Sequence, residues 1–251
     1  MQALIRDNIR LAASIILLRS SSAGPEVFMM QRPGGVDFPD LHVFPGGKVD
    51  QQDFLPEFVD GCDEASANAQ LGVSGGGLRY WVAAIRECFE EAGVLLARRV
   101  DKTLELLDES EVSRFNDYRQ QLIHGELSME TLCRQEGLQL AADAMQYFSH
   151  WLTPESAPRR FDTRFFIAVM PAGQETAAHA WETADSQWVT PAAALAEGHA
   201  GRWQMISPTL VTLSSLAGYA GVSEIRTAVA REEHIGELTL ELSSQGMQPL
   251  R

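Results

Sequence analysis

The hydrophobic pattern at the start of the chain predicts a pair of strands. Residues 11–18 form an almost continuous apolar run, and turn-forming residues follow from Ser20 to Pro25. A short apolar run with such a flank is typical of a buried strand, so we expect one over about 10–19. Val27–Gln31 is again mostly apolar, and the two segments together predict a hairpin.

A longer periodic segment predicts a helix from about Leu78 to Ala92. Its large apolar residues recur at i, i+4, i+7 and i+8, which places them on one stripe of a helix. These residues are Trp81, Ile85, Cys88 and Phe89. Gly93 comes next, and glycine is common at the position just after a helix.

The remainder of the chain mixes helical and extended patterns. Residues 104–150 are expected to be largely helical, because their apolar residues recur at helical spacing and Ser128 suits a helix start. Further on we expect strands over 164–170 and 187–189, a helix after Pro191 and another from Pro208. Strands interleaved with long helical segments predict an α+β or α/β fold with insertions.

Composition and net charge narrow the classes of function. The 251 residues are 45% hydrophobic and 22% charged, which is typical of a globular domain. The formal net charge of -14 repels nucleic-acid phosphates and anionic lipids, so we expect no nucleic acid and no membrane as partners. An acidic protein can still act on an anionic substrate when divalent cations neutralise the charge locally.

The cysteines indicate a reducing compartment. Cys62, Cys88 and Cys133 are odd in number and widely spaced, which disfavours a disulfide framework and a thiolate zinc site. The early apolar run lies behind Arg6 and Arg10 and so resembles a short signal peptide, but a buried strand is the preferred interpretation. With no membrane-length apolar run and no peroxisomal signal at the carboxyl end, we expect a cytoplasmic protein.

Three glutamates form a cluster of carboxylates on the predicted helix. Glu87, Glu90 and Glu91 stand at i, i+3 and i+4, so their carboxylates share one helix face. Like charges this close repel each other unless a cation lies among them, and hard carboxylate oxygens suit Mg²⁺ or Mn²⁺. The alternative is a solvated acidic face, which is the commoner origin of such a pattern taken by itself.

The surrounding residues resemble the Nudix box, G-x5-E-x7-R-E-U-x-E-E-x-G-U, in which U is a bulky apolar residue. Arg86–Val94 matches the second half when Cys88 takes the apolar position, and Phe44–Lys48 resembles the F-P-G-G-K start of the first half. Asp53 stands where the family has a glutamate, but residues 54–85 then separate it from the arginine. These 32 residues replace the usual 7, so the insertion is 32 − 7 = 25 residues and leaves the register of Asp53 open.

This split box is similar to that of the coenzyme A diphosphatase branch of the Nudix hydrolase superfamily, and the likeness covers most of residues 8–220. It implies an α+β fold, namely an α/β/α sandwich with a mixed central sheet and two mainly helical insertions. We expect a single domain over 1–251, with insertions at about 54–77 and 101–150 that cover the substrate cleft. Family members often pair, so a homodimer stays an open option.

The resemblance also implies roles within the box. Glu90 and Glu91 are expected to be the principal ligands of Mg²⁺ or Mn²⁺, and Glu87 a further ligand or the residue that orients the attacking water. The carbonyl of Gly46 would complete the coordination, and Arg86 would hold the carboxylates by charge-assisted hydrogen bonds. The implied reaction is attack of water on a diphosphate, assisted by cations that polarise phosphoryl oxygens.

Other site residues are assigned with alternatives. Glu182 is the candidate base because some Nudix enzymes use a glutamate from a later loop; Glu175 is the second choice, and a plain surface acid is the alternative. Arg32, Gly47 and Arg164 are the candidates for substrate binding. A surface position is the alternative for Arg32, and an ion pair with a neighbouring acid is the alternative for Arg164.

These observations lead to three functional hypotheses. The first is hydrolysis of coenzyme A or acyl-CoA to 3′,5′-ADP and (acyl-)4′-phosphopantetheine. The second keeps the fold but takes another small-molecule nucleotide, namely ADP-ribose, a dinucleotide or a nucleoside triphosphate. The third is a non-catalytic nucleotide-binding module. Such modules usually lose glutamates from the box, whereas this chain retains them.

Overall fold

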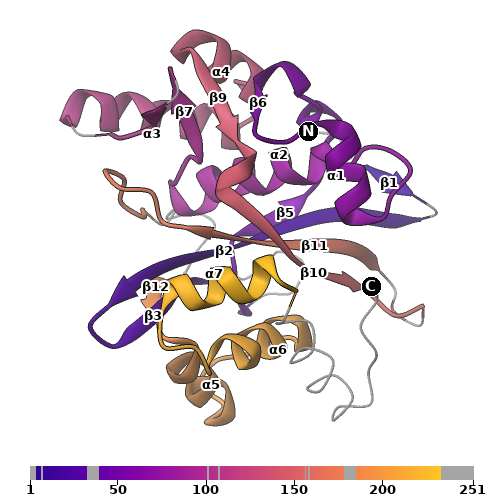
Figure 1. The fold of residues 1–251 in the computed structure, drawn as a ribbon, viewed down its shortest axis with the longest axis vertical. Coiled ribbons are helices and arrows are strands. Elements are labelled where there is room, and N and C mark those ends of the chain that lie inside the picture. Colours follow the sequence, from indigo (N-terminus) through magenta and orange to yellow (C-terminus); the bar gives the residue numbers. More distant parts are fainter. Residues whose placement is uncertain are drawn as a thin grey trace.

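The protein forms three layers, in which a twisted sheet separates two groups of helices (Figure 1). The structure is a computed structural model that describes residues 4–6, 8–32, 40–100, 102–106, 108–155, 157, 159–177 and 185–232. Within these ranges, no helix is long and apolar enough to cross a membrane. The layered arrangement is the α/β/α sandwich expected from the sequence.

The central sheet is mixed, as expected. Its main strands are β2 (Ile9–Ser21), β3 (Gly24–Gln31), β10 (Met145–Leu152), β11 (Arg160–Val169) and β12 (Asp185–Val189). They lie in the order β10-β11-β2-β3-β12, and only β11 and β2 pair in parallel. Short strands at the margins are β1 (Ile5–Arg6), β4 (His42–Val43) and β5 (Gly46–Lys48). The predicted hairpin is therefore confirmed as β2 and β3.

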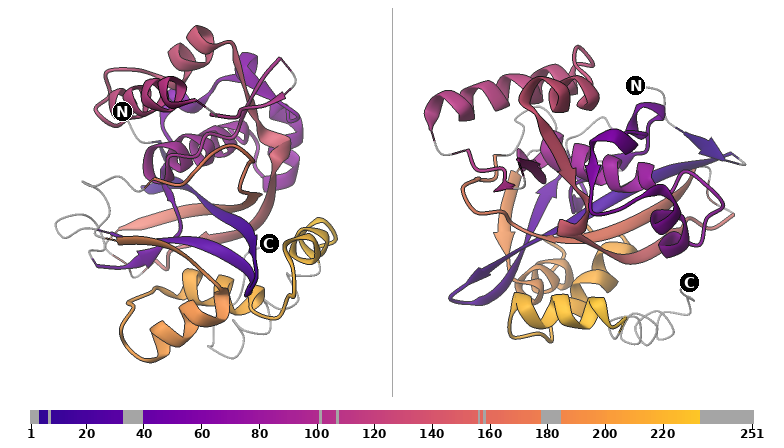
Figure 2. Two further views of the ribbon diagram at one scale, coloured as in Figure 1. Left: turned by 90° about the vertical axis from the view of Figure 1, so that its left-hand side faces the viewer. Right: turned by 45° about the horizontal axis from the view of Figure 1, so that its top comes forward.

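Alternation along β2 divides its side chains between two cores. Leu11, Ile15 and Leu17 face α2 (Leu78–Glu87). Ile16 and Leu18 face the opposite layer, which consists of α5 (Pro191–His199), α6 (Ser207–Leu216) and α7 (Val222–Ala230). Two further views keep α5, α6 and α7 together on the side of the sheet away from α2 (Figure 2). The run reads as continuously apolar because both faces of the strand are covered.

A second, smaller sheet lies on the α2 side. Its order is β6-β9-β7-β8. The strands are β6 (Val59–Asp60), β7 (Ala97–Arg99), β8 (Lys102–Thr103) and β9 (Leu138–Ala141). Associated helices are α1 (Glu64–Leu71), α3 (Glu109–Ile123) and α4 (Met129–Glu136), with single turns η1 (Gln51–Asp53), η2 (Pro56–Phe58) and η4 (Ala142–Ala144). The inserted segments therefore build a layer over α2 that mixes helices with short strands, whereas 145–150 of the expected second insertion belong to β10 of the central sheet.

The expectation of a largely helical segment over 104–150 is correct for α3 and α4 and wrong for 138–150. Gly137 takes the left-handed conformation at φ 62° and ends α4. Leu138 and Leu140 are then buried on either side of exposed Gln139, which is the period of a strand. β10 forms by pairing with β11, a contact between distant segments that helical spacing does not reveal.

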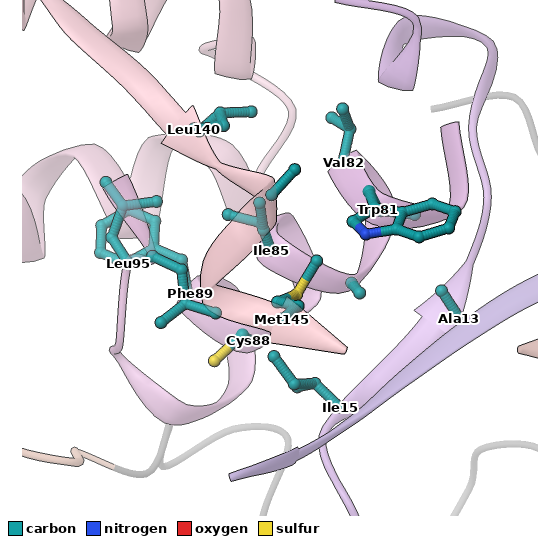
Figure 3. Packing of buried hydrophobic residues seen from close by; sticks show 14 of the residues in the cluster. Ala13, Ile15, Trp81, Val82, Ile85, Cys88, Phe89, Leu95, Leu140 and Met145 are labelled. Atoms are coloured by element: carbon teal, nitrogen blue, oxygen red, sulfur yellow. The ribbon is translucent and has the colours of Figure 1, made fainter. Parts of the chain in front are cut away.

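The predicted apolar stripe of the 78–92 segment is confirmed. Its four large residues are at most 2% exposed. The close-up shows Ile85, Cys88 and Phe89 near Ile15 of β2 and Leu140 of β9 (Figure 3). This packing seats one side of the segment in the core and leaves the glutamate face for chemistry.

Candidate active site

The glutamate segment changes from an α-helix to a wider turn. α2 ends at Glu87, and the π-helical turn η3 (Cys88–Ala92) continues it. Gly93 closes the turn in the left-handed region at φ 74°, a conformation that suits glycine. π-Helical turns are frequent at functional sites, and this one contains Glu90 and Glu91. The single helix expected over 78–92 therefore consists of an α-helix followed by a π-helical turn.

Arg86 lies buried at the centre of the acidic cluster. Its Nε and Nη2 donate to the two carboxylate oxygens of Asp53 at 2.8 and 3.1 Å. Its Nη1 donates to Glu87 Oε1 at 2.8 Å and to Glu90 Oε2 at 3.2 Å. Nη2 also donates to the carbonyl of Lys48 at 2.8 Å. One guanidinium thereby neutralises part of a concentrated negative charge and fixes three carboxylates relative to one another.

Asp53 has a defined place in this network despite the insertion that follows it. It is 1% exposed, and its Oδ2 also accepts the backbone N–H of Asp50 at 2.7 Å. The inserted chain returns at α2, where Glu64 of α1 accepts the N–H of Leu78 at 3.0 Å. This carboxylate accepts from a free N–H in the first turn of α2, and its negative charge interacts favourably with the positive end of the helix dipole. The two separated halves of the box thus meet, and Asp53 pairs with Arg86.

Two glycines of β5 allow close approach to the glutamates. A Cβ on Gly46 would lie 2.6 Å from the carbonyl oxygen of Ala13, so β5 can pack against β2 only without a side chain there. A Cβ on Gly47 would lie 2.5 Å from the carboxylate of Glu87. The N–H of Gly46 donates to Glu91 Oε2 at 2.6 Å. The strand therefore holds one glutamate by its backbone and makes room for another.

The carboxyl group of Glu90 lies buried within the cluster, and its pKa is strongly raised. Glu90 is 5% exposed, and its Oε1 is buried without a hydrogen-bond partner. Burial raises the pKa of Glu90 to about 8, the positive charge of Arg86 opposes this shift, and the negative charge of Glu87 adds to it. A buried acceptor without a donor is costly unless something else binds it.

The cluster fits a hard divalent cation by its chemistry. Carboxylate and carbonyl oxygens are the preferred ligands of Mg²⁺ and Mn²⁺, and the unsatisfied Glu90 Oε1 is such an oxygen. In the described part of the chain, no three acidic, histidine or cysteine side chains already converge as a metal site. Arg86 and the Gly46 N–H hold the glutamates instead, so these side chains would have to reorient to bind a cation.

Arg119 of α3 is a site residue that the sequence analysis missed. It is 3% exposed, and it donates to the carbonyls of Glu90 and Glu91 at 2.9 and 3.0 Å. The available signal was its position between Phe115 and Leu122, on the buried stripe of a helix. A charged residue on an apolar stripe indicates a specific buried partner.

The two arginines proposed for substrate contact differ in their surroundings. Arg32 follows β3, and its Nη2 donates to the carbonyl of Gly46 at 3.2 Å, beside the glutamates. Arg164 is 5% exposed and donates to Asp162 at 3.1 Å, to the Leu71 carbonyl at 3.1 Å and to the Tyr147 hydroxyl at 3.2 Å. These contacts favour the ion-pair alternative for Arg164, while Arg32 stays next to the site.

The segment that carries the second-choice base adjoins the end of the glutamate turn. Gln174 bonds the N–H and the carbonyl of Leu95, each at 2.9 Å, and the N–H of Ala177 donates to the carbonyl of Ala92 at 2.9 Å. Glu175 lies between these two attachments and is exposed. The first-choice base, Glu182, lies outside the described residues.

Comparisons with known proteins identify the family of this chain. The family model described as the NUDT19 Nudix domain matches residues 74–216, more than half of the chain. The acyl-coenzyme A diphosphatase NUDT19 of Xenopus laevis is 24% identical over 241 residues, covering 82% of this chain and 63% of that protein. Putative nudix hydrolase 7 of Caenorhabditis elegans is 26% identical over 214 residues, covering 85% of this chain and 62% of that protein. The chain therefore spans a little under two thirds of the length of these relatives.

A solved structure shows the same fold. The crystal structure of a Nudix hydrolase from Alicyclobacillus acidocaldarius superposes with a TM-score of 0.71 at 24% identity, covering 88% of this chain and 96% of that chain. The matched family model begins before α2 and so includes the glutamate turn with its buried arginine. The chain belongs to the Nudix hydrolases, in the family that the NUDT19 Nudix domain defines.

Proposed function

We propose that this protein is a metal-dependent diphosphatase that hydrolyses coenzyme A or acyl-CoA to 3′,5′-ADP and (acyl-)4′-phosphopantetheine. The observation that carries the metal-dependent chemistry is the buried, unpartnered Glu90 Oε1 within a cluster of carboxylates. Support for the substrate comes from the relative named acyl-coenzyme A diphosphatase NUDT19 and from the family model. Within this proposal the partner is a small-molecule nucleotide, the compartment is the cytoplasm, and homodimerisation is left open.

Mg²⁺ or Mn²⁺ would be held by Glu87, Glu90, Glu91 and the carbonyl of Gly46. When bound, such a cation supplies positive charge to the diphosphate and makes a bound water more acidic. The Gly46 carbonyl already accepts one bond from Arg32, and a carbonyl oxygen has a second lone pair for a further ligand. An acidic protein repels an anionic substrate, and a bound cation would offset this repulsion.

The remaining site residues orient the carboxylates, neutralise phosphate charge or accept a proton. Arg86 holds the carboxylates of Glu87 and Glu90 next to each other through its hydrogen bonds and offsets part of their mutual repulsion. Arg32 stands beside the Gly46 carbonyl, where its guanidinium can meet a phosphate oxygen. The attacking water needs a proton acceptor, for which Glu182 is the first candidate and Glu175 the second.

The test combines a substrate panel with a conservative variant. Purified protein is incubated with Mg²⁺ or Mn²⁺ and coenzyme A, acetyl-CoA, ADP-ribose, a dinucleotide and a nucleoside triphosphate, and the products are resolved by mass. We expect 3′,5′-ADP from the coenzyme A compounds, no turnover in chelator, and loss of at least about a hundredfold in Glu90→Gln. If another nucleotide is hydrolysed faster, the substrate assignment changes, but the proposed metal-dependent hydrolysis stands.

A matched control separates the site from the general acidity of the chain. Glu130→Gln removes an exposed carboxylate that pairs with Arg134 on the same helix. We expect this variant to turn over like the wild type. Unchanged turnover in Glu90→Gln, with its fold confirmed by circular dichroism, would overturn the mechanism. Tight nucleotide binding without any hydrolysis would instead favour the non-catalytic module.

A further inference from the structure

Arg119 connects the second insertion to the glutamate turn. It belongs to α3, 29 residues along the chain from Glu90, yet its Nε donates to the Glu90 carbonyl at 2.9 Å. Its Nη2 donates to the next carbonyl, that of Glu91, at 3.0 Å. The side chain is buried, at 3% exposure, and it reaches the turn from the side of the inserted layer.

The turn needs a donor at this place. The last carbonyls of a helix have no partner within it, and the negative end of the helix dipole lies there. A forked guanidinium satisfies two adjacent carbonyls and brings a positive charge to that end. Gly93 also leaves room for the fork, because a Cβ at this position would lie 3.1 Å from Arg119 Nη1.

The glutamate turn is therefore held from two sides. Arg119 binds the backbone at Glu90 and Glu91, while the N–H of Gly46 binds the Glu91 carboxylate at 2.6 Å. Rotation of the backbone at either glutamate would redirect its carboxylate. Groups behind a metal ligand that fix its orientation commonly control metal affinity.

We propose that Arg119 is a positioning residue that sets the Glu90–Glu91 turn for divalent cation binding, which makes the second insertion part of the active site. The inference rests on the proposed metal-dependent function. It assigns Arg119 no contact with substrate. It also gives the insertion a role beyond covering the cleft, because removing its arginine should change the metal site itself.

The experiment measures Mn²⁺ binding without substrate, by calorimetry or by the electron paramagnetic resonance signal of free Mn²⁺. We expect Arg119→Gln to weaken Mn²⁺ binding by about 10- to 100-fold, the range typical for groups behind metal ligands. Arg119→Lys keeps the charge but not the fork, so its loss should be smaller and still measurable. At saturating Mn²⁺, turnover by Arg119→Lys should be closer to the wild-type rate than turnover by Arg119→Gln.

Arg114→Gln is the matched control, because Arg114 lies on the same helix and bonds Glu136 instead of the glutamate turn. We expect its Mn²⁺ affinity to equal that of the wild type. If Arg119→Gln does not fold, the lysine variant decides. Wild-type Mn²⁺ affinity in either folded Arg119 variant overturns the proposal.

The design keeps this proposal distinct from the proposed function. If Mn²⁺ binds the wild type and is lost in Glu90→Gln, but the Arg119 variants bind normally, then only the role of Arg119 fails. If the wild type shows no Mn²⁺ binding that depends on Glu90, then the metal-dependent function fails and the role of Arg119 fails with it.

Discussion

Asp53 and Arg86 form a two-pronged ion pair, with both contacts between 2.8 and 3.1 Å, although 32 residues separate them in the chain. Both side chains are at most 5% exposed. A paired charge is tolerated in such a place, but a charge left alone there is not. The pair therefore joins the two halves of the box and keeps the arginine beside the glutamates.

Breaking this pair should destabilise the protein. Asp53→Ala removes the two-pronged partner of the buried guanidinium and leaves it paired with Glu87 and Glu90, so we expect the free energy of unfolding to fall by about 3 kcal/mol. Urea denaturation followed by circular dichroism measures the change. Glu130→Gln is the control, because its exposed pair with Arg134 is worth about 0.5 kcal/mol or less. Equal losses in the two variants would contradict the assigned importance of Asp53.

Substitution of the two neighbouring glycines, Gly46 and Gly47, by alanine should affect stability and turnover differently. Gly47→Ala meets only the end of the Glu87 side chain, which can shift at the expense of its bond to Arg86, so we expect a modest loss of stability and a loss of turnover of about tenfold or more. Gly46→Ala meets the backbone of Ala13, so we expect a clear fall in melting temperature. Gly218→Ala, with no atom within 4 Å of the added carbon, is the control. Similar stability loss at both box glycines would refute the distinction.

Divalent cation binding should release a proton. Burial raises the pKa of Glu90 from 4.5 to about 8, so this carboxyl is largely protonated at neutral pH before a cation binds. The ligand must be deprotonated, and apparent Mn²⁺ affinity should therefore rise with pH up to about 8. Calorimetry in two buffers of different ionisation enthalpy measures the released proton. Identical heats in both buffers would contradict this prediction.

The same shift fixes how stability depends on pH without a cation. Between pH 4.5 and about 8 the folded protein binds more protons at Glu90 than the unfolded chain does. Stability of the cation-free protein should therefore fall as pH rises through this window. Glu90→Gln should show a weaker dependence in denaturant titrations at several pH values. A rise in stability attributable to Glu90 over the window would show that the sign is wrong.

Arg164 should behave as a structural residue. Its guanidinium is engaged by Asp162, the Leu71 carbonyl and Tyr147, so Arg164→Gln should lower stability and leave KM within about twofold. Arg32→Gln, beside the Gly46 carbonyl, should instead raise KM with little change in stability. Steady-state kinetics and thermal unfolding of both variants distinguish the two roles. A large KM increase in Arg164→Gln would restore it as a substrate contact.

Local patterns predicted the elements whose reasons are local. The run over β2, the stripe from Trp81 to Phe89 and the turn at Gly93 each follow from a periodicity or a conformational preference that neighbouring residues express. β10 was missed because its partner β11 is a separate segment, and pairing between distant segments overrides local helical spacing.

By itself, the sequence predicted that Glu87, Glu90 and Glu91 share one helix face, because spacing on a helix is a matter of geometry within one segment. It also placed Gly46 and Gly47 in the box, whereas their close approach to β2 and Glu87 is a feature of the tertiary structure. Only the tertiary structure decided that Asp53 reaches Arg86 across the insertion and that Arg119 reaches the glutamate turn. Both contacts join segments far apart in the chain, and their energy comes from burial and charge that exist only once those segments pack together.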